Sequence, residues 1–326
     1  MATLRVEETR FALAERFTIS RGARSEARVV TVSLSDAGHV GHGECVPYAH
    51  YGESVASVIA QIESLREALA SGLDREALQT RLPAGAARNA VDCALWDLEA
   101  KRRATPVWAL AGLAPPQAQI CAYTLSLDTP AVMRDKARRH AERPLLKIKL
   151  GGEGDLERLR AVREGAPRAR LIVDANEGWD LPTYQRLAPR LVELGIEMVE
   201  QPLPASDDAS LAQIERRLPV CADEACHDRS SLAALVGRYD LINIKLDKSG
   251  GLTEALALKR EAQALGFGVM VGCMVGSSLS MAPALLVAQG ATVVDLDGPL
   301  LLARDRDPGL HYDAMGVHPA PPALWG

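Results

Sequence analysis

Residues 145–174 read LLKIKLGGEGDLERLRAVREGAPRARLIVD, and this stretch decides the fold. An apolar run at 145–150 is followed by a glycine-rich loop and then by residues 155–165, whose apolar positions recur at helical spacing and end on a glycine. A second apolar run ends on Asp174. This order predicts a strand, a loop, a helix and a second strand parallel to the first.

The same unit recurs along the chain from about residue 118. Polar loops and stretches of helical period separate eight apolar runs: ICAYTLSL (120–127), LLKIKL (145–150), RLIVDAN (170–176), MVEQPL (198–203), VCADEA (220–225), LINIKLDKSGG (241–251), GVMVGCM (268–274) and TVVDLDGP (292–299). Strands that alternate with helices predict an α/β fold, here a TIM-type barrel over residues 116–300. In such barrels the chemistry lies at the carboxyl ends of the strands.

The two flanking segments have different patterns. Residues 1–115 combine the alternating run ARVVTVSLSD (27–36) with helical spacing at 86–101, which predicts an α+β domain. Residues 301–326 lack a strong helical period and carry three prolines near the end. We expect this last segment to pack back on the first domain.

Composition narrows the class of protein. The 326 residues are 48% hydrophobic, enough for a large core, but no apolar run approaches the ~18 to 20 residues of a membrane-spanning helix. The start, MATLRVEETR, is unlike a signal peptide, so we expect a cytoplasmic protein without membrane contacts. A net charge of −5 without a basic stripe argues against nucleic acid. A small-molecule substrate is the favoured partner, and a homo-oligomer is compatible with the sequence.

Three carboxylates stand at the ends of successive predicted strands. They are Asp174, Glu200 and Asp223, separated by 26 and 23 residues. A single strand-end aspartate could serve only to cap the next helix. Three in register form a hard, oxygen-rich site that suits Mg²⁺ and leaves positions open for substrate oxygens. Glu224 is adjacent to Asp223, and the spacing alone does not decide which of the two is the third ligand.

Lysines accompany these carboxylates. Lys147 and Lys149 alternate around Ile148, so both side chains point into the barrel, and Lys245 ends a strand across the barrel from Lys149. We expect mutual repulsion and a nearby divalent cation to lower a lysine pKa and so create a general base. Two such lysines on opposite sides of a carbon acid would remove a proton from one face and deliver one to the other.

These motifs resemble a known family. The segments VDANEGW (173–179), EQPLP (200–204), CADE (221–224) and NIKLDKSGGLTEAL (243–256) are similar to the muconate-lactonizing subgroup of the enolase superfamily. More narrowly, FTISRGARSEARVV (17–30), PAGAARNAVDCALWDLEA (83–100) and DLDGP (295–299) resemble the dipeptide epimerases, in particular bacterial L-Ala-D/L-Glu epimerases.

The resemblance implies a modified (β/α)7β barrel under an N-terminal α+β capping domain. It implies one Mg²⁺ per subunit on Asp174, Glu200 and Asp223, which favours Asp223 over Glu224. It also implies that Lys149 and Lys245 are the acid/base pair. Lys147 would support the substrate carboxylate and the enediolate that forms from it.

Substrate choice is expected to depend on other residues. Asp295 and Asp297 alternate around Leu296 and therefore face one pocket, which suits a free ammonium group. By resemblance, they hold the α-amino group of a dipeptide, Arg24 receives the glutamate side chain, and Thr124 and Cys273 line the site. The expected activity is interconversion of L-Ala-D-Glu and L-Ala-L-Glu in the reuse of murein peptides.

Three alternatives stay open from sequence. The first is a dipeptide epimerase of different specificity, since loop residues tune the pocket. The second is a lyase or cycloisomerase such as o-succinylbenzoate synthase, which uses the same machinery on a substrate without an amino group. The two aspartates argue against it, because they would repel such a dianion. The third is a binding protein without catalysis, although every central position is filled.

Overall fold

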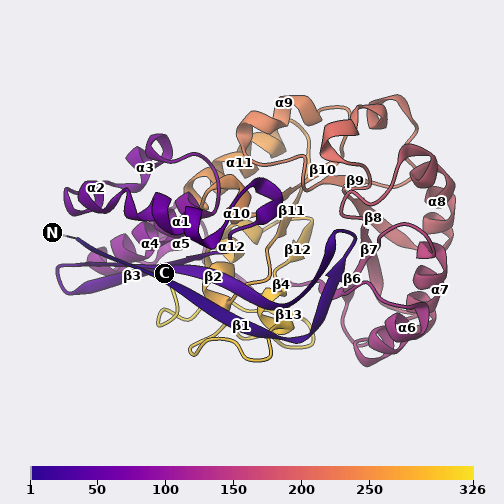
Figure 1. Ribbon diagram of the computed structural model, residues 1–326, viewed down its shortest axis with the longest axis horizontal. Helices are drawn as coiled ribbons and strands as arrows, with labels where there is room; N and C mark the ends of the chain where they lie inside the picture. The colour runs from indigo at the N-terminus through magenta and orange to yellow at the C-terminus, as the bar shows by residue number, and fades with distance from the viewer. Residues whose placement is uncertain (1) are drawn as a thin grey trace.

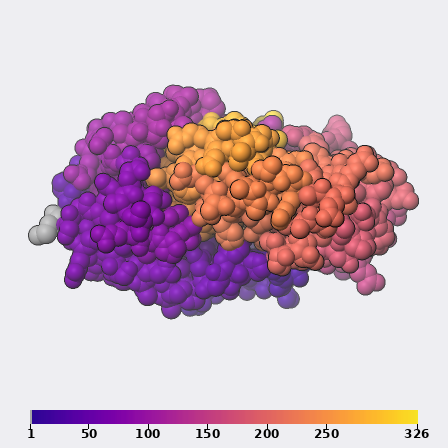
Figure 2. All heavy atoms as spheres, turned by 90° about the horizontal axis from the view of Figure 1, so that it is seen from above, coloured from indigo at the N-terminus to yellow at the C-terminus, as the bar shows by residue number. Residues whose placement is uncertain are grey.

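The computed structural model describes residues 2–326 and contains an antiparallel sheet with helices beside an eight-stranded parallel barrel (Figure 1). Seen from above, the N-terminal residues and the second half of the barrel lie directly against each other (Figure 2). The fold is thus the predicted α/β barrel with an N-terminal α+β cap. The chain limits of the domains, at 115 and 300, remain predictions.

The cap begins with a long β-hairpin. Strands β1 (Thr3–Ile19) and β2 (Gly22–Asp36) pair antiparallel, and β3 (His39–Cys45) adds to β2. The hairpin reaches across to the barrel, with its turn near β6 and β7 (Figure 1). At the turn, the Ser20 hydroxyl donates to Asn176 O at 2.8 Å. The hairpin therefore carries the turn segment, including Arg21, to the mouth of the barrel.

Helices pack on the cap sheet and on one another. They are α1 (Val55–Glu63), α2 (Arg66–Ala70), α3 (Arg75–Arg81), α4 (Ala86–Arg103) and α5 (Val107–Leu110), with the 3-10 turn η1 (Ala49–Tyr51) before them. The longest, α4, lies so close to β3 that a Cβ at Gly43 would overlap the Ala90 carbonyl. Gly41 and Gly43 thus permit close packing of this strand and helix.

The barrel strands are parallel and follow chain order around the ring. They are β5 (Tyr123–Leu125), β6 (Leu145–Lys149), β7 (Arg170–Asp174), β8 (Ile196–Glu200), β9 (Val220–Ala222), β10 (Leu241–Ile244), β11 (Gly268–Gly272) and β12 (Val293–Asp295). The Ala122 N–H donates to Val294 O at 2.8 Å, which joins the first strand to the last. The two ends of the sheet thus meet, and the barrel is nearly closed.

An apolar layer fills the base of the barrel. It takes one buried side chain from each strand or, before β5, from the residue that precedes it: Ala122, Leu145, Ile172, Met198, Cys221, Leu241, Met270 and Val293. Because strand side chains alternate, the next inward positions toward the carboxyl ends include Lys147, Asp174 and Glu200. The charged site therefore stands on a packed hydrophobic floor.

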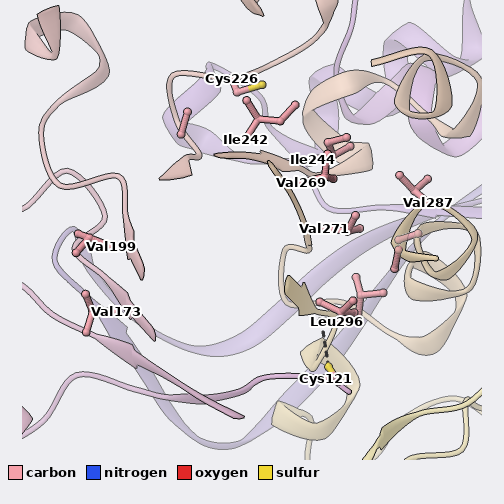
Figure 3. Close-up of a cluster of buried hydrophobic side chains, with 14 of the residues drawn as sticks. Cys121, Val173, Val199, Cys226, Ile242, Ile244, Val269, Val271, Val287 and Leu296 are labelled. Atoms are coloured by element: carbon pink, nitrogen blue, oxygen red, sulfur yellow. Dashed lines mark hydrogen bonds between the residues drawn. The ribbon is translucent and has the colours of Figure 1, made fainter. Parts of the chain in front are cut away.

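Helices surround most of the ring. They are α6 (Pro130–Arg139), α7 (Asp155–Gly165), α8 (Leu181–Glu193), α9 (Leu232–Leu235), α10 (Leu246–Ser249), α11 (Leu252–Ala264) and α12 (Ser278–Ala288). Outward strand side chains such as Val173, Ile242 and Val271 belong to the core cluster drawn in Figure 3, together with Val287 of α12. No α-helix follows β8, where only the 3-10 turns η2 (Ala205–Asp207) and η3 (Ala209–Gln213) occur among the described residues. Pro202 and Pro204 lie between β8 and these turns.

The last segment contacts both parts. After η5 (Gly298–Leu301), β13 (Gly316–Val317) pairs with β4 (Gln119–Ile120). The Trp325 indole N–H donates to Cys93 O at 3.1 Å, and Gly326 N donates to Asp97 Oδ1 at 2.9 Å. Both acceptors lie on α4 of the cap. Within residues 2–326, no helix combines the length and the apolar character needed to cross a bilayer.

Candidate active site

The three predicted metal ligands meet at the barrel mouth. Asp174 ends β7, Glu200 ends β8 and Asp223 directly follows β9. One carboxylate oxygen from each lies within 4.8 Å of the others, and all three side chains are fully buried. Three buried anions so close together require compensating positive charge. Glu224 lies outside this group, because its Oε1 accepts from Arg21 at 2.6 Å.

Lysines supply part of that charge. Lys147 Nζ lies 2.6 Å from Glu200 Oε2, 3.1 Å from Asp174 Oδ2 and 2.7 Å from Asp295 Oδ2. Lys149, two residues along the same strand, donates to Asp174 Oδ2 at 2.6 Å. Lys147 thus connects the carboxylate cluster to the aspartates of the eighth strand.

Lys245 approaches from the other side. It follows β10, four places from β6 in the ring of eight, so it lies opposite Lys149. Its Nζ donates to Asp223 Oδ2 at 2.6 Å. Both lysines line one pocket together with Asp223. The structure therefore places the two lysines on opposite sides of the cluster, as the sequence predicts.

Charge compensation shifts the pKa values within the cluster. Burial alone would raise the pKa of Asp174, but Lys149 and Lys147 lower it. Burial, reinforced by Asp174, raises the pKa of Glu200 to about 8. Burial alone would lower the pKa of Lys245, yet Asp223 and Glu200 raise it well above its usual value. For Lys245 the direction is thus opposite to the lowered lysine pKa expected from sequence, which assumed a nearby cation.

The cluster fits a hard divalent cation. Glu200 Oε2 is buried and accepts no hydrogen bond, although Lys147 lies close to it. The donors are all carboxylate oxygens, which is the chemistry that Mg²⁺ prefers. A bound cation would also favour the ionised form of Glu200.

The six predicted substrate residues gather in the same pocket. Its lining includes Arg24, Thr124, Lys147, Cys273, Asp295 and Asp297. Thr124 N donates to Asp297 Oδ2 at 2.6 Å, so that carboxylate is held in place. Burial and the neighbouring Asp295 raise the pKa of Asp297 to about 7. The Arg24 guanidinium stacks over Tyr48, 5.6 Å from the ring centroid.

Several residues of the site were not predicted. Arg21 donates to Asn176 O at 2.8 Å as well as to Glu224, which ties the hairpin turn to the loop after β7. Asn243 donates to Glu200 Oε1 at 2.8 Å, and Lys248 lies 2.6 Å from Asp223 Oδ1. The alternation of Asn243 with Lys245 could have revealed the first of these two contacts, because both positions face inward.

The comparisons with known proteins agree with this geometry. Residues 1–112 match the mandelate racemase / muconate lactonizing enzyme N-terminal domain, and residues 132–310 match the enolase C-terminal domain-like family. The chain therefore belongs to the enolase superfamily, in its mandelate racemase and muconate lactonizing branch.

Named relatives narrow the class further. The chain is 50% identical to the L-Ala-D/L-Glu epimerase of Escherichia coli over 98% of its own length and all of that protein. It is 43% identical to an N-acetyl-D-glutamate racemase from a Pseudoalteromonas species, over 91% of this chain and 95% of that protein. A crystal structure from Agrobacterium tumefaciens, described as an enolase family member with homology to dipeptide epimerases and with bound sodium and L-Ala-L-Glu, matches with a TM-score of 0.98 and 55% identity over all of both chains. The protein is thus an isomerase of the epimerase and racemase class.

Proposed function

We propose that this enzyme interconverts L-Ala-D-Glu and L-Ala-L-Glu by moving the α-proton of the C-terminal residue, in the reuse of murein peptides. The observation that carries this proposal is the position of Lys149 and Lys245 on opposite sides of one pocket. One lysine would accept the proton from one face, and the other would donate a proton to the opposite face. The 50% identity to an enzyme named for this reaction supports the substrate.

The α-proton next to a carboxylate is very weakly acidic, so the negative charge that develops must be stabilised as it forms. Mg²⁺ held by Asp174, Glu200 and Asp223 would supply fixed positive charge at this point. Lys147 adds a second positive charge, because its ammonium is fully buried and held among three carboxylates. These groups are fixed before substrate arrives, which favours the transition state over the ground state.

The two ends of the dipeptide would be recognised by opposite charges. Asp295 and Asp297 would hold the α-ammonium group, and Arg24 would receive the γ-carboxylate of glutamate. A lyase substrate without an amino group would meet two anions at that end of the pocket. N-acetylglutamate, the substrate type of one relative, likewise offers no cation to these aspartates.

Proton NMR in D₂O tests the proposal. With Mg²⁺ and L-Ala-L-Glu, we expect the glutamate α-proton signal to disappear while the second diastereomer appears. N-acetyl-L-glutamate and L-Ala-L-Leu serve as parallel substrates, the first lacking the ammonium group and the second the γ-carboxylate. Faster exchange of N-acetylglutamate than of the dipeptide would overturn the assignment of substrate. No exchange of any of the three would overturn the reaction.

A further inference from the structure

A second group of side chains that could hold a metal ion lies in the C-terminal segment, and its ligand types differ from those of the carboxylate cluster. His311, Asp313 and His318 offer three ligand atoms that lie within 4.8 Å of one another. They belong to the C-terminal segment, around β13, which runs beside β4 (Figure 1). The proposed reaction makes no use of them.

The backbone holds these three residues together as a hairpin. His318 N donates to His311 O at 3.0 Å, and Asp313 N donates to Gly316 O at 3.0 Å. The two imidazole rings lie with their centroids 4.7 Å apart. His311 and His318 are therefore directly opposite each other in the hairpin. Their short side chains keep the two rings close together.

The Asp313 carboxylate is oriented by the same turn. Its Oδ1 accepts from Met315 N at 2.8 Å and from Gly316 N at 2.9 Å. Its Oδ2 is hydrogen-bonded to His318 Nε2 at 2.8 Å, a contact that metal binding would replace. Backbone hydrogen bonds to one carboxylate oxygen are the outer support that metal-binding carboxylates commonly have.

We propose that His311, Asp313 and His318 form a binding site for a divalent transition metal such as Zn²⁺. Two imidazoles and one carboxylate suit zinc or copper and not Mg²⁺, which prefers oxygen ligands. Ligand bonds of about 2.0–2.2 Å require the three atoms to stand roughly 3 to 3.5 Å apart, so only small side-chain rotations separate the present arrangement from a chelate. The fourth position would be open to water, since His311 and Asp313 are exposed.

The site would stiffen a hairpin that contacts the barrel. Between the two ligands His311 and Asp313, the Tyr312 hydroxyl donates to Leu296 O at 2.6 Å. Leu296 stands between Asp295 and Asp297. A metal that fixes the hairpin would therefore also fix the contact beneath the substrate aspartates.

Copper(II) is a direct probe, because imidazole nitrogen coupling in pulsed EPR distinguishes this site from the all-carboxylate cluster. The experiment uses the full chain with saturating Mg²⁺ and one equivalent of Cu²⁺. We expect a signal from two imidazoles, together with a rise in Tm when Zn²⁺ is added. His318→Gln and His311→Gln should each weaken binding by more than the ~10- to 100-fold typical of losing an outer partner.

His39→Gln is the matched control, because His39 is an exposed histidine on β3. It should leave both the copper signal and the zinc-dependent Tm unchanged. Epimerase turnover with Mg²⁺ verifies that each variant is folded. The proposal is wrong if folded His311→Gln and His318→Gln bind Cu²⁺ with the same two-imidazole signal and affinity as the unmodified protein, and also if the unmodified protein gives no imidazole coupling.

Discussion

Lys248 and Asp223 form a buried ion pair in which Nζ lies 2.6 Å from Oδ1. Lys245 occupies the other oxygen of the same carboxylate. Lys248 belongs to the one-turn helix α10 and is almost fully buried, so its charge has no access to water. Asp223 is thus held from both sides by ammonium groups, and one of them belongs to a proposed base.

Replacement of Lys248 by methionine tests whether its ammonium group compensates the same negative charge that a metal cation would. Removing one partner of a buried pair costs about 3–5 kcal/mol, because the other charge stays buried. Added Mg²⁺ would restore part of the missing positive charge. We therefore expect Lys248→Met to lower Tm and to show a larger Mg²⁺-induced rise in Tm than the unmodified enzyme, measured by differential scanning calorimetry.

Lys101→Met provides the control for this prediction. Lys101 pairs with the buried Asp97 at 2.7 Å on α4 of the cap, away from the carboxylate cluster. Its loss should lower Tm without changing the response to Mg²⁺. Equal Mg²⁺ responses in Lys248→Met and Lys101→Met would contradict the idea that Lys248 compensates the metal site.

The two proposed bases should be separable by isotope exchange. Lys149→Ala and Lys245→Ala are each expected to lose epimerisation by at least the ~10²- to 10⁴-fold that a general base contributes. Each variant retains one lysine, so each should still exchange the α-proton of one diastereomer in D₂O, and the two variants should select opposite diastereomers. Exchange of the same diastereomer by both variants would argue against bases on opposite faces.

Arg24 should determine the preference for glutamate over an apolar residue at the C-terminal position of the dipeptide. Loss of a hydrogen bond between charged groups costs about 1.5–3 kcal/mol, which corresponds to roughly 10- to 150-fold. We expect Arg24→Met to reduce kcat/KM for L-Ala-L-Glu by that factor and to leave L-Ala-L-Leu nearly unaffected, in steady-state assays of both dipeptides.

The control is Arg28→Met on the same hairpin. Arg28 is exposed and pairs with Glu8 at 2.7 Å, outside the pocket lining. Its substitution should leave kcat/KM unchanged for both dipeptides. A similar loss for both dipeptides in Arg24→Met would instead indicate that Arg24 acts on the common part of the substrate or on the hairpin itself.

The barrel and its ring of charges could be predicted because two periodicities coincide. Apolar runs recur at intervals close to one strand plus one helix, and side chains alternate within each strand. Lys149, Asp174 and Glu200 occupy strand positions where alternation alone fixes the inward direction. Their convergence then follows from the parallel order of the strands.

Contacts that lie outside regular strands could not be predicted in the same way. Lys248 stands in a single helical turn, where alternation gives no direction for its side chain. Arg21 meets Glu224 across 203 positions of sequence, through a hairpin whose reach over the barrel no local pattern specifies.

The stability of the metal-free enzyme should depend on pH through Glu200. Its folded pKa of about 8 lies above the ordinary value of 4.5, because burial and Asp174 disfavour its charge. Between these values the folded state binds more protons than the unfolded state, so stability falls as pH rises. Asp92, Asp247 and Asp297, with pKa values raised to about 6, about 7 and about 7, add slopes of the same sign, and none of the three is a proposed metal ligand.

The contribution of Glu200 can be isolated with Mg²⁺. A cation at the cluster would favour ionised Glu200 and would remove the part of the fall in stability with pH that comes from Glu200. The parts that come from the other aspartates would remain. We expect Tm in EDTA to fall from pH 6.5 to 8 and to fall less steeply in Mg²⁺. In Glu200→Gln the EDTA slope should be shallower, because the group that must lose its proton is gone. If that variant keeps the full EDTA slope of the unmodified enzyme, the pH dependence arises elsewhere and Glu200 is already ionised without a metal.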